Sequence, residues 1–217
     1  MIEAVFFDLD GTLFDRDAAV GGIAAWQAQA FAAAIMPERS VRFVERVTVL
    51  DEHGHRDKRE VYDIVAAEFG LDVSVRDQLI DSFWSEYPRH CRLSEGVAAT
   101  LFELRQRGRR LGVITNGSAA VQNAAIDALG VREAMDVILI SETEGLRKPD
   151  AELFRRAAAR VGVPVGRCCF VGDHPTIDVA GATAAGLRAF WKRTSYWSPS
   201  ERVRTIDAVS DILRFIA

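Results

Sequence analysis

The sequence predicts an α/β protein in which a doubly wound parallel sheet is joined to a separate helical domain. Apolar runs typical of buried strands alternate with helical segments from residue 95 to residue 191, the pattern of a parallel sheet covered by helices on both faces. The first strand, residues 4–7, is separated from this alternation by a long helical block. A chain of 217 residues is long enough for one core and a smaller second domain.

The helical block begins soon after the first strand, which ends in the polar segment Asp8-Leu9-Asp10-Gly11-Thr12. From Asp17 to Pro88 apolar residues recur every three or four positions, as on the buried faces of packed helices. Pro88 is expected to stop the last of these helices. We therefore predict a domain resembling a four-helix bundle over residues 15–91, and a sheet domain formed by residues 1–14 and 92–217.

The rest of the chain supplies the other strands of the sheet. A glycine follows each expected helix, where a left-handed backbone is common. The expected helices are 95–107, 118–129, 150–161 and 177–185, and the expected strands are 111–114, 137–140, 168–171 and 187–191. Ligands of such sheets bind beyond the carboxyl ends of the strands, where the strand order reverses. Catalytic residues are therefore expected at the strand ends.

Composition excludes several classes of protein. The 27 basic and 31 acidic residues give a net charge of −4, so no strong basic field favours nucleic acid. The three cysteines are too few for a disulfide framework. No basic leader or long apolar span is present at the start of the sequence or later. We expect a cytoplasmic protein that acts without membrane or nucleic acid, as a monomer or a homodimer.

Acidic residues mark the ends of two expected strands. Asp8 and Asp10 lie two positions apart, so in an extended segment their side chains point to the same side. Two neighbouring carboxylates repel each other and need a cation or a shared proton. Asp173, after a later strand, adds a third oxygen ligand. Carboxylates with water and a phosphate suit Mg²⁺, which the sequence therefore predicts as the cofactor.

A lysine stands out among the basic residues. Only Lys58, Lys148 and Lys192 are lysines, and the other 24 basic residues are arginines. A compact, flexible ammonium suits a crowded site better than a planar guanidinium does. Lys148, which follows Arg147 directly, is therefore a candidate for neutralising charge between two anions.

Four motifs together resemble those of the haloacid dehalogenase-like (HAD) hydrolase superfamily. They are Asp8-Leu9-Asp10-Gly11-Thr12, Thr115-Asn116, Lys148-Pro149 and Gly172-Asp173-His174-Pro175-Thr176-Ile177-Asp178. The helical block after the first motif resembles the α-helical cap of one subclass, and the resemblance covers essentially the whole chain. It implies a Rossmann-like core and a cap domain.

The resemblance also implies roles for the motif residues. Asp8 would attack phosphorus and form an aspartyl-phosphate, and Asp10 would act as acid and base. The Asp8 and Asp173 carboxylates, with the backbone carbonyl of Asp10, would hold Mg²⁺. The remaining roles are phosphoryl binding by Thr115, Asn116 and Lys148, and support of the metal site by Asp178.

The predicted function is a Mg²⁺-dependent phosphatase that hydrolyses a small phosphorylated metabolite. Asp10 favours this over halide displacement, which needs no proton donor; the dehalogenases of the superfamily lack an acid there. A phosphomutase on a sugar phosphate is the nearest alternative, and a phospho-accepting receiver-type signalling domain is one from another class. A phosphonate-cleaving enzyme would need a cap lysine for a Schiff base, and Lys58 is the candidate.

Specificity is expected to come from the helical domain, because the four motifs recognise only the phosphoryl group. Residues 51–59 form its densest polar segment, and Gly54 permits a turn there. Arg56 or Arg59 could pair with an anionic or hydroxylated part of the substrate if this segment faces it. A solvated connector between helices is the alternative.

Overall fold

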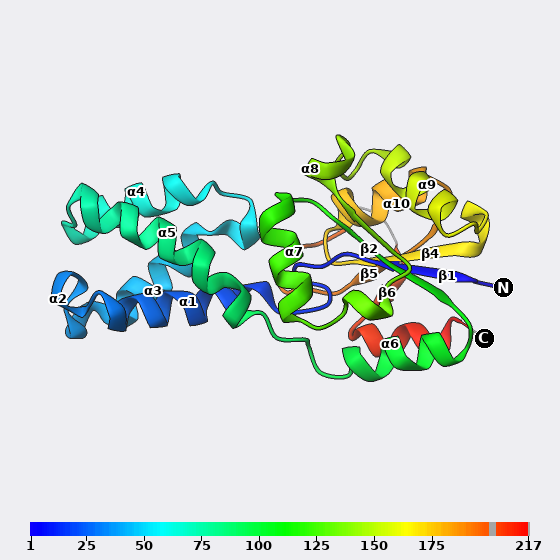
Figure 1. Cartoon of the computed structure of the whole chain (residues 1–217), viewed down its shortest axis with the longest axis horizontal. Coiled ribbons are helices and arrows are strands. Elements are labelled where there is room, and N and C mark those ends of the chain that lie inside the picture. The colour runs from blue at the N-terminus through cyan, green and yellow to red at the C-terminus, as the bar shows by residue number, and fades with distance from the viewer. Residues whose placement is uncertain (200–202, 217) are drawn as a thin grey trace. The chain divides into compact units, whose positions relative to one another are not determined.

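The chain folds into two compact units (Figure 1) in a computed structural model that describes residues 1–199 and 203–216. The core unit comprises Met1–Phe14 and Leu93–Ala217, and the helical unit comprises Asp15–Arg92. Across the described residues, no helix is both long and apolar enough to cross a membrane.

A parallel sheet of six strands runs through the described part of the core unit, which confirms the predicted fold class. The strands are β1 (Ala4–Phe7), β2 (Arg110–Thr115), β3 (Val137–Ile140), β4 (Cys168–Gly172), β5 (Arg188–Lys192) and β6 (Thr205–Ile206). Their order is β3-β2-β1-β4-β5-β6, and every pair is parallel. The chain builds outward from β1 in one direction and then resumes at β4 in the other. The strand order therefore reverses between β1 and β4.

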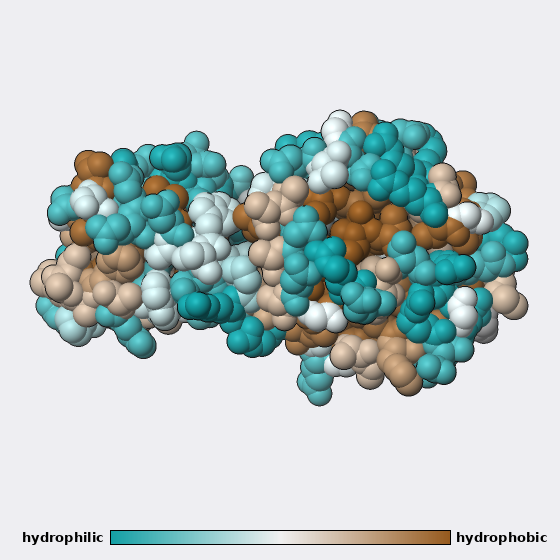
Figure 2. All heavy atoms as spheres, viewed as in Figure 1, coloured by the Kyte–Doolittle hydropathy of each residue, from teal (hydrophilic) through white to brown (hydrophobic). Residues whose placement is uncertain are grey.

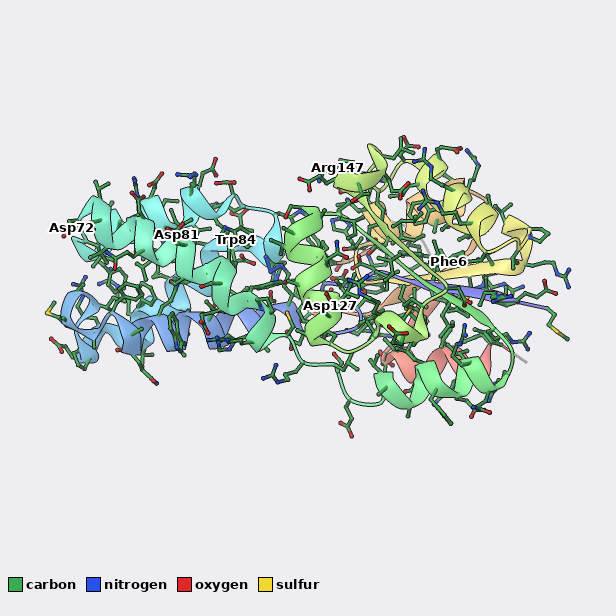
Figure 3. All side chains as sticks on the ribbon, in the orientation of Figure 1. Phe6, Asp72, Asp81, Trp84, Asp127 and Arg147 are labelled. Carbon is green, nitrogen blue, oxygen red and sulfur yellow. The ribbon has the colours of Figure 1, made fainter. Side chains whose placement is uncertain are left out.

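Helices cover both faces of this sheet. They are α6 (Val97–Gln106), α7 (Ala119–Ala128), α8 (Ser141–Glu144), α9 (Ala151–Arg160) and α10 (Gly181–Ala184). Figure 1 shows α9 and α10 on one face, and α6 with the carboxyl-terminal helical segment on the other. Each residue of β1 is fully buried, as expected of a central parallel strand, and Phe6 lies inside the core unit in Figure 3.

The face of the core unit shown in Figure 2 has apolar residues gathered over the strands and polar residues over the surrounding helices. The edge strand β3 contributes Ile138, which is half-buried, whereas its other residues are buried. Burial of most strand residues agrees with the continuous apolar runs in the sequence.

The helical unit consists mainly of four longer helices. These are α1 (Arg16–Ala30), α3 (Ser40–Leu50), α4 (Lys58–Phe69) and α5 (Val73–His90), with the short α2 (Ala32–Ile35) after α1. Helix α1 packs against α3 and α5, and α4 packs against the same two helices. The prediction that Pro88 stops the last helix is wrong, because α5 continues through it to His90. A proline in the last turn removes one amide donor but leaves the earlier turns intact.

The segment after β4 also differs from the prediction of one α-helix over residues 177–185. A π-helical turn, Pro175–Ala180, precedes the short α10. His174 caps this turn, since its Nδ1 accepts hydrogen bonds from the backbone amides of Thr176 and Ile177. Wide turns of this kind are frequent at functional sites. The wide turn brings Asp178 back toward the end of β4, where its carboxylate accepts from the His174 amide.

Candidate active site

The first and last motifs meet where the strand order reverses. Asp8 follows β1 and Asp173 follows β4, and these two strands are paired, with Phe7 opposite Val171. The Asp8 amide continues the ladder by donating to the Val171 carbonyl at 2.9 Å. Figure 3 shows polar side chains gathered beyond the ends of the strands. The acidic residues therefore lie where the sheet topology predicts a ligand site.

Lys148 joins two of these carboxylates. Its Nζ donates to Asp8 Oδ1 at 2.5 Å and to Asp178 Oδ1 at 2.7 Å, and its side chain is 3% exposed. The carboxylates of Asp8, Asp173 and Asp178 each place an oxygen within 4.8 Å of the other two. One ammonium thus lies among three buried carboxylates, and this oxygen-only donor set fits a hard cation such as Mg²⁺.

Burial and neighbouring charges shift the pKa values of this group. Burial raises the pKa of Asp8 well above its ordinary value; Lys148 opposes this, and the Asp178 and Asp173 charges add to it. Burial, with the Asp178 charge, raises the pKa of Asp173 to about 7. Burial alone would lower the pKa of Lys148, but the Asp178 and Asp8 charges outweigh it and raise that pKa. With all three carboxyl groups ionised, the cluster would hold more negative charge than one lysine balances, which is why a further cation would stabilise it.

Close packing around Asp173 explains a glycine in the first motif. Gly11 has φ +75°, and a Cβ placed on it would lie 2.5 Å from Asp173 Oδ2. A side chain at position 11 would therefore be strained and would also displace the carboxylate. The glycine lets the first motif approach the last one closely.

Residues of β5 and of the loop after it donate hydrogen bonds to Asp173 and to the neighbouring Gly11. The Trp191 indole N–H donates to the Asp173 carbonyl at 2.7 Å, and the Tyr196 hydroxyl donates to Asp173 Oδ2 at 3.3 Å. Lys192 Nζ donates to the Gly11 carbonyl at 2.9 Å. The sequence does not indicate these contacts, because no motif surrounds the three residues.

Asp10 and Thr115 share one partner in the structure. The Gln122 side chain, from α7, donates through Nε2 to Asp10 Oδ2 at 3.1 Å. Its Oε1 accepts from the Thr115 hydroxyl at 3.0 Å. Gln122 is only 5% exposed. Sequence reasoning misses this residue; a polar side chain on the buried face of the helix after Thr115-Asn116 is the signal that could have found it.

Asn116 lies at the end of β2 and ties this strand to the loop that carries Lys148. Its Nδ2 donates to the Lys148 carbonyl at 3.0 Å, and its Oδ1 accepts from the Lys148 amide at 2.9 Å. The pair of bonds fixes the backbone from which the Lys148 side chain reaches Asp8. The structure thus gathers all four motifs at one edge of the sheet.

Comparison with known proteins identifies the family. The model of the haloacid dehalogenase-like hydrolases matches residues 2–186. The chain belongs to this family. The resemblance predicted from the four motifs is thereby confirmed, and the protein is a hydrolase.

Two phosphatases are similar to this hydrolase in sequence, and solved structures of other proteins are similar to it in fold. A phosphoserine phosphatase of Thermus thermophilus is 38% identical over 114 residues, which cover 52% of this chain and 45% of that enzyme. A glyceraldehyde 3-phosphate phosphatase of Methanopyrus kandleri is 28% identical over 194 residues, covering 86% and 82%. The magnesium-bound HAD hydrolase YfnB of Bacillus subtilis superposes with a TM-score of 0.80 at 19% identity, covering 99% and 98%. Structures of 2-haloacid dehalogenases are similar too.

The two arginines predicted to set specificity in this hydrolase lie in the helical unit. Arg56 forms an ion pair with Glu52, four residues earlier. Arg59 is exposed in the first turn of α4, and its amide donates to the Asp57 carboxylate at 2.8 Å. Neither is part of the cluster around Lys148, and their role in specificity stays a prediction.

Proposed function

We propose that this hydrolase is a Mg²⁺-dependent phosphatase that acts on a small phosphorylated metabolite. The observation that carries the proposal is the arrangement at the switch point. A buried carboxylate, Asp8, is paired with Lys148 and lies within 4.8 Å of oxygens of Asp173 and Asp178, and a second carboxylate, Asp10, follows two residues later. The names of the relatives, which are phosphatases of phosphoserine and glyceraldehyde 3-phosphate, support the same reaction.

The proposed reaction has two displacements. An Asp8 oxygen forms a bond to phosphorus while the bond from phosphorus to the substrate oxygen breaks, and Asp10 gives its proton to the departing alkoxide. Water then attacks the phosphorus of the aspartyl-phosphate, the bond from phosphorus to the Asp8 oxygen breaks, and Asp10 takes the proton from that water. Inorganic phosphate leaves, and both carboxylates return to their starting states.

The phosphoryl group needs positive and hydrogen-bonding partners. Lys148 neutralises charge between Asp8 and the incoming phosphate, since its ammonium already contacts the Asp8 carboxylate. Thr115 and the Asn116 amide would bind phosphoryl oxygens from the end of β2, and the Thr115 hydroxyl would then exchange its bond to Gln122 for one to the phosphate. Asp178 keeps Lys148 in place through the bond at 2.7 Å.

Mg²⁺ is the proposed cofactor. The Asp8 and Asp173 carboxylates, with the Asp10 backbone carbonyl, would hold it, and Asp178 would support the site. The ion would supply positive charge that offsets the negative charge on both the carboxylates and the phosphate. The excess of carboxylates over ammonium groups in this cluster supports this assignment.

Phosphate transfer to water is favoured over the alternatives by particular residues. Asp10 supplies an acid that halide displacement does not require. Membership of a hydrolase family argues against a receiver-type signalling domain. A phosphomutase shares the first displacement and differs only in the acceptor of the phosphate, so we keep it as the enzymatic alternative.

We further propose that residues 15–91 form a cap domain and that specificity resides there. In this proposal the protein works in the cytoplasm on a small molecule, as a monomer or homodimer.

The decisive experiment is a screen of phosphorylated metabolites with the purified protein. Phosphate release is measured with Mg²⁺ and again with excess EDTA, and sugar phosphates are also analysed for positional isomers. The proposal expects many turnovers with Mg²⁺ and almost none with EDTA. Isomer formation without phosphate release would establish the mutase. No phosphate release from any ester, or full activity in EDTA, would refute the proposal.

A further inference from the structure

Gln122 connects two residues of the proposed mechanism that are far apart in the sequence. Its Nε2 lies 3.1 Å from Asp10 Oδ2 and its Oε1 lies 3.0 Å from Thr115 Oγ1. The amide nitrogen therefore donates to a carboxyl oxygen of Asp10, and the amide oxygen accepts from the Thr115 hydroxyl. The donor end of the amide thus binds an acceptor, and its acceptor end binds a donor.

The surroundings of Gln122 hold this amide in place. A Cβ placed on Gly117 would lie 2.7 Å from Gln122 Nε2, so the backbone of the loop packs directly against the side chain. Helix α7 is anchored at its start, where the Ala119 amide donates to Glu142 Oε2 at 2.7 Å. A side chain that is 5% exposed and packed in this way has little freedom to turn.

We propose that Gln122 is a positioning residue that aims the Asp10 carboxylate at the leaving-group oxygen. Proton transfer requires the acid to lie within hydrogen-bonding reach of the departing oxygen, and small displacements reduce the rate strongly. Asp10 is half-buried, and the Gln122 amide donates to its Oδ2. The inference rests on the proposed function, because it takes Asp10 as the acid.

The role predicts a particular kinetic signature. A residue that acts through the general acid matters most when the leaving group is a poor one. Loss of Gln122 should therefore slow the hydrolysis of alkyl phosphates more than that of p-nitrophenyl phosphate, whose leaving group needs little protonation. A residue that only stabilises the fold would reduce both rates by the same factor.

The test compares Gln122→Met with Asn123→Leu. Asn123 is a matched control on the same helix, because its amide bonds to the Ala119 carbonyl and to Arg132. We expect Gln122→Met to lower kcat about 10-fold on an alkyl phosphate and several-fold less on p-nitrophenyl phosphate, with KM changing little. Asn123→Leu should change both rates equally, if at all. Equal losses on both esters in Gln122→Met would overturn the inference.

A second variant covers the case in which Gln122→Met does not fold. Gln122→Glu keeps the shape and the acceptor for Thr115 but replaces the donor to Asp10 by an oxygen. It should show the same selective loss on alkyl esters. Wild-type dependence on the leaving group in Gln122→Glu would overturn the inference.

A double-mutant cycle with Asp10→Asn gives the final check. If Gln122 acts through Asp10, adding Gln122→Met to Asp10→Asn should not increase the dependence on the leaving group. If the effects of the two substitutions on the rate are fully additive, Gln122 does not act through Asp10. Failure of the wild-type protein to release phosphate would instead refute the proposed function. If the wild type is active and the rate depends more steeply on the leaving group in Asp10→Asn but not in Gln122→Met, only the role of Gln122 is refuted.

Discussion

Two buried lysines, one in each unit, lie in opposite electrostatic surroundings. In the core unit, Lys148 contacts two carboxylates, Asp8 and Asp178, and its pKa is raised. In the helical unit, Lys58 forms an ion pair with one carboxylate, Asp51, and its side chain is 6% exposed. Burial lowers the pKa of Lys58, and the Asp51 charge only partly opposes this.

The difference lies in which charge is in excess. Around Lys148, three carboxylates gather near one ammonium, so a further cation would be stabilised there. Around Asp51, two cations share one carboxylate, since Arg16 also approaches Asp51 Oδ1, at 3.4 Å. The first cluster is suited to bind a metal ion and a phosphate, whereas the second joins α1 to the start of α4. We therefore propose that a buried ion pair belongs to the active site in one unit and is a structural contact in the other.

The largest expected effect comes from comparing Asp8 with Asp51. Asp8→Asn should lower kcat by about 10⁴-fold or more, because a neutral amide cannot form the covalent intermediate. Its thermal midpoint should not fall, since one of the crowded carboxylates is removed. Asp51→Asn should instead lower the free energy of unfolding by about 3 kcal/mol and leave kcat on p-nitrophenyl phosphate within about 2-fold. Steady-state kinetics and thermal unfolding of the two variants measure these effects. An active Asp8→Asn protein would refute the assignment of Asp8 as the nucleophile.

The two lysines provide the next comparison. Lys148→Met should reduce kcat about 10²- to 10³-fold, because charge between nucleophile and phosphate is no longer neutralised. Lys58→Met should mainly lower stability, by about 3 kcal/mol, because Asp51 loses its ammonium partner. Similar losses of activity in both variants would contradict the assignment of Lys58 to structure. A phosphonate-cleaving activity that Lys58→Met abolishes would point to Schiff-base chemistry instead.

The pH dependence of stability should distinguish the carboxylate cluster from the rest of the chain. Asp173 has a pKa of about 7 in the folded protein and an ordinary value of 3.8. The folded state therefore binds more protons than the unfolded state between these values, and stability falls as the pH rises through this range. We expect the thermal midpoint in EDTA to decrease from about pH 4 to pH 7, and Mg²⁺ to restore it most at the upper end.

Asp173→Asn provides the control for this prediction. It should flatten the decrease and raise the Mg²⁺ concentration needed for half-maximal activity, because an anionic ligand is lost. The same pH slope in Asp173→Asn as in the wild type would show that other groups cause the decrease.

The smallest expected effect concerns Arg56 and Arg59. Replacing either by alanine should raise KM a few-fold on the best metabolite and leave p-nitrophenyl phosphate hydrolysis unchanged. Stability should change by less than about 0.5 kcal/mol, since Arg59 is exposed and the half-buried Arg56 pairs only with the exposed Glu52. If both variants keep the wild-type kcat and KM on every substrate, residues 51–59 are a connector between helices and specificity comes from other residues of the helical unit.

Most of the fold can be predicted from the sequence, because the signals are local. Continuous apolar runs such as Val137–Ile140 identify buried strands to within a residue, and the glycines after helices mark their ends. The local signals fail where a later contact decides the shape. Pro88 does not end its helix, and the last motif forms a π-helical turn because His174 caps it and Asp178 returns to its amide.

The sequence by itself determined which chemical groups stand at the strand ends, since parallel strands bring their carboxyl ends to one edge. Only the tertiary structure decided how those groups are paired. Lys148 and Asp8 are 140 residues apart, and Gln122 and Asp10 are 112 apart, so no periodicity links them. Likewise, only packing makes Lys58 a buried partner of Asp51. Secondary structure depends on neighbours within a few positions, whereas the charge balance of a site depends on whatever the fold brings within a few ångström.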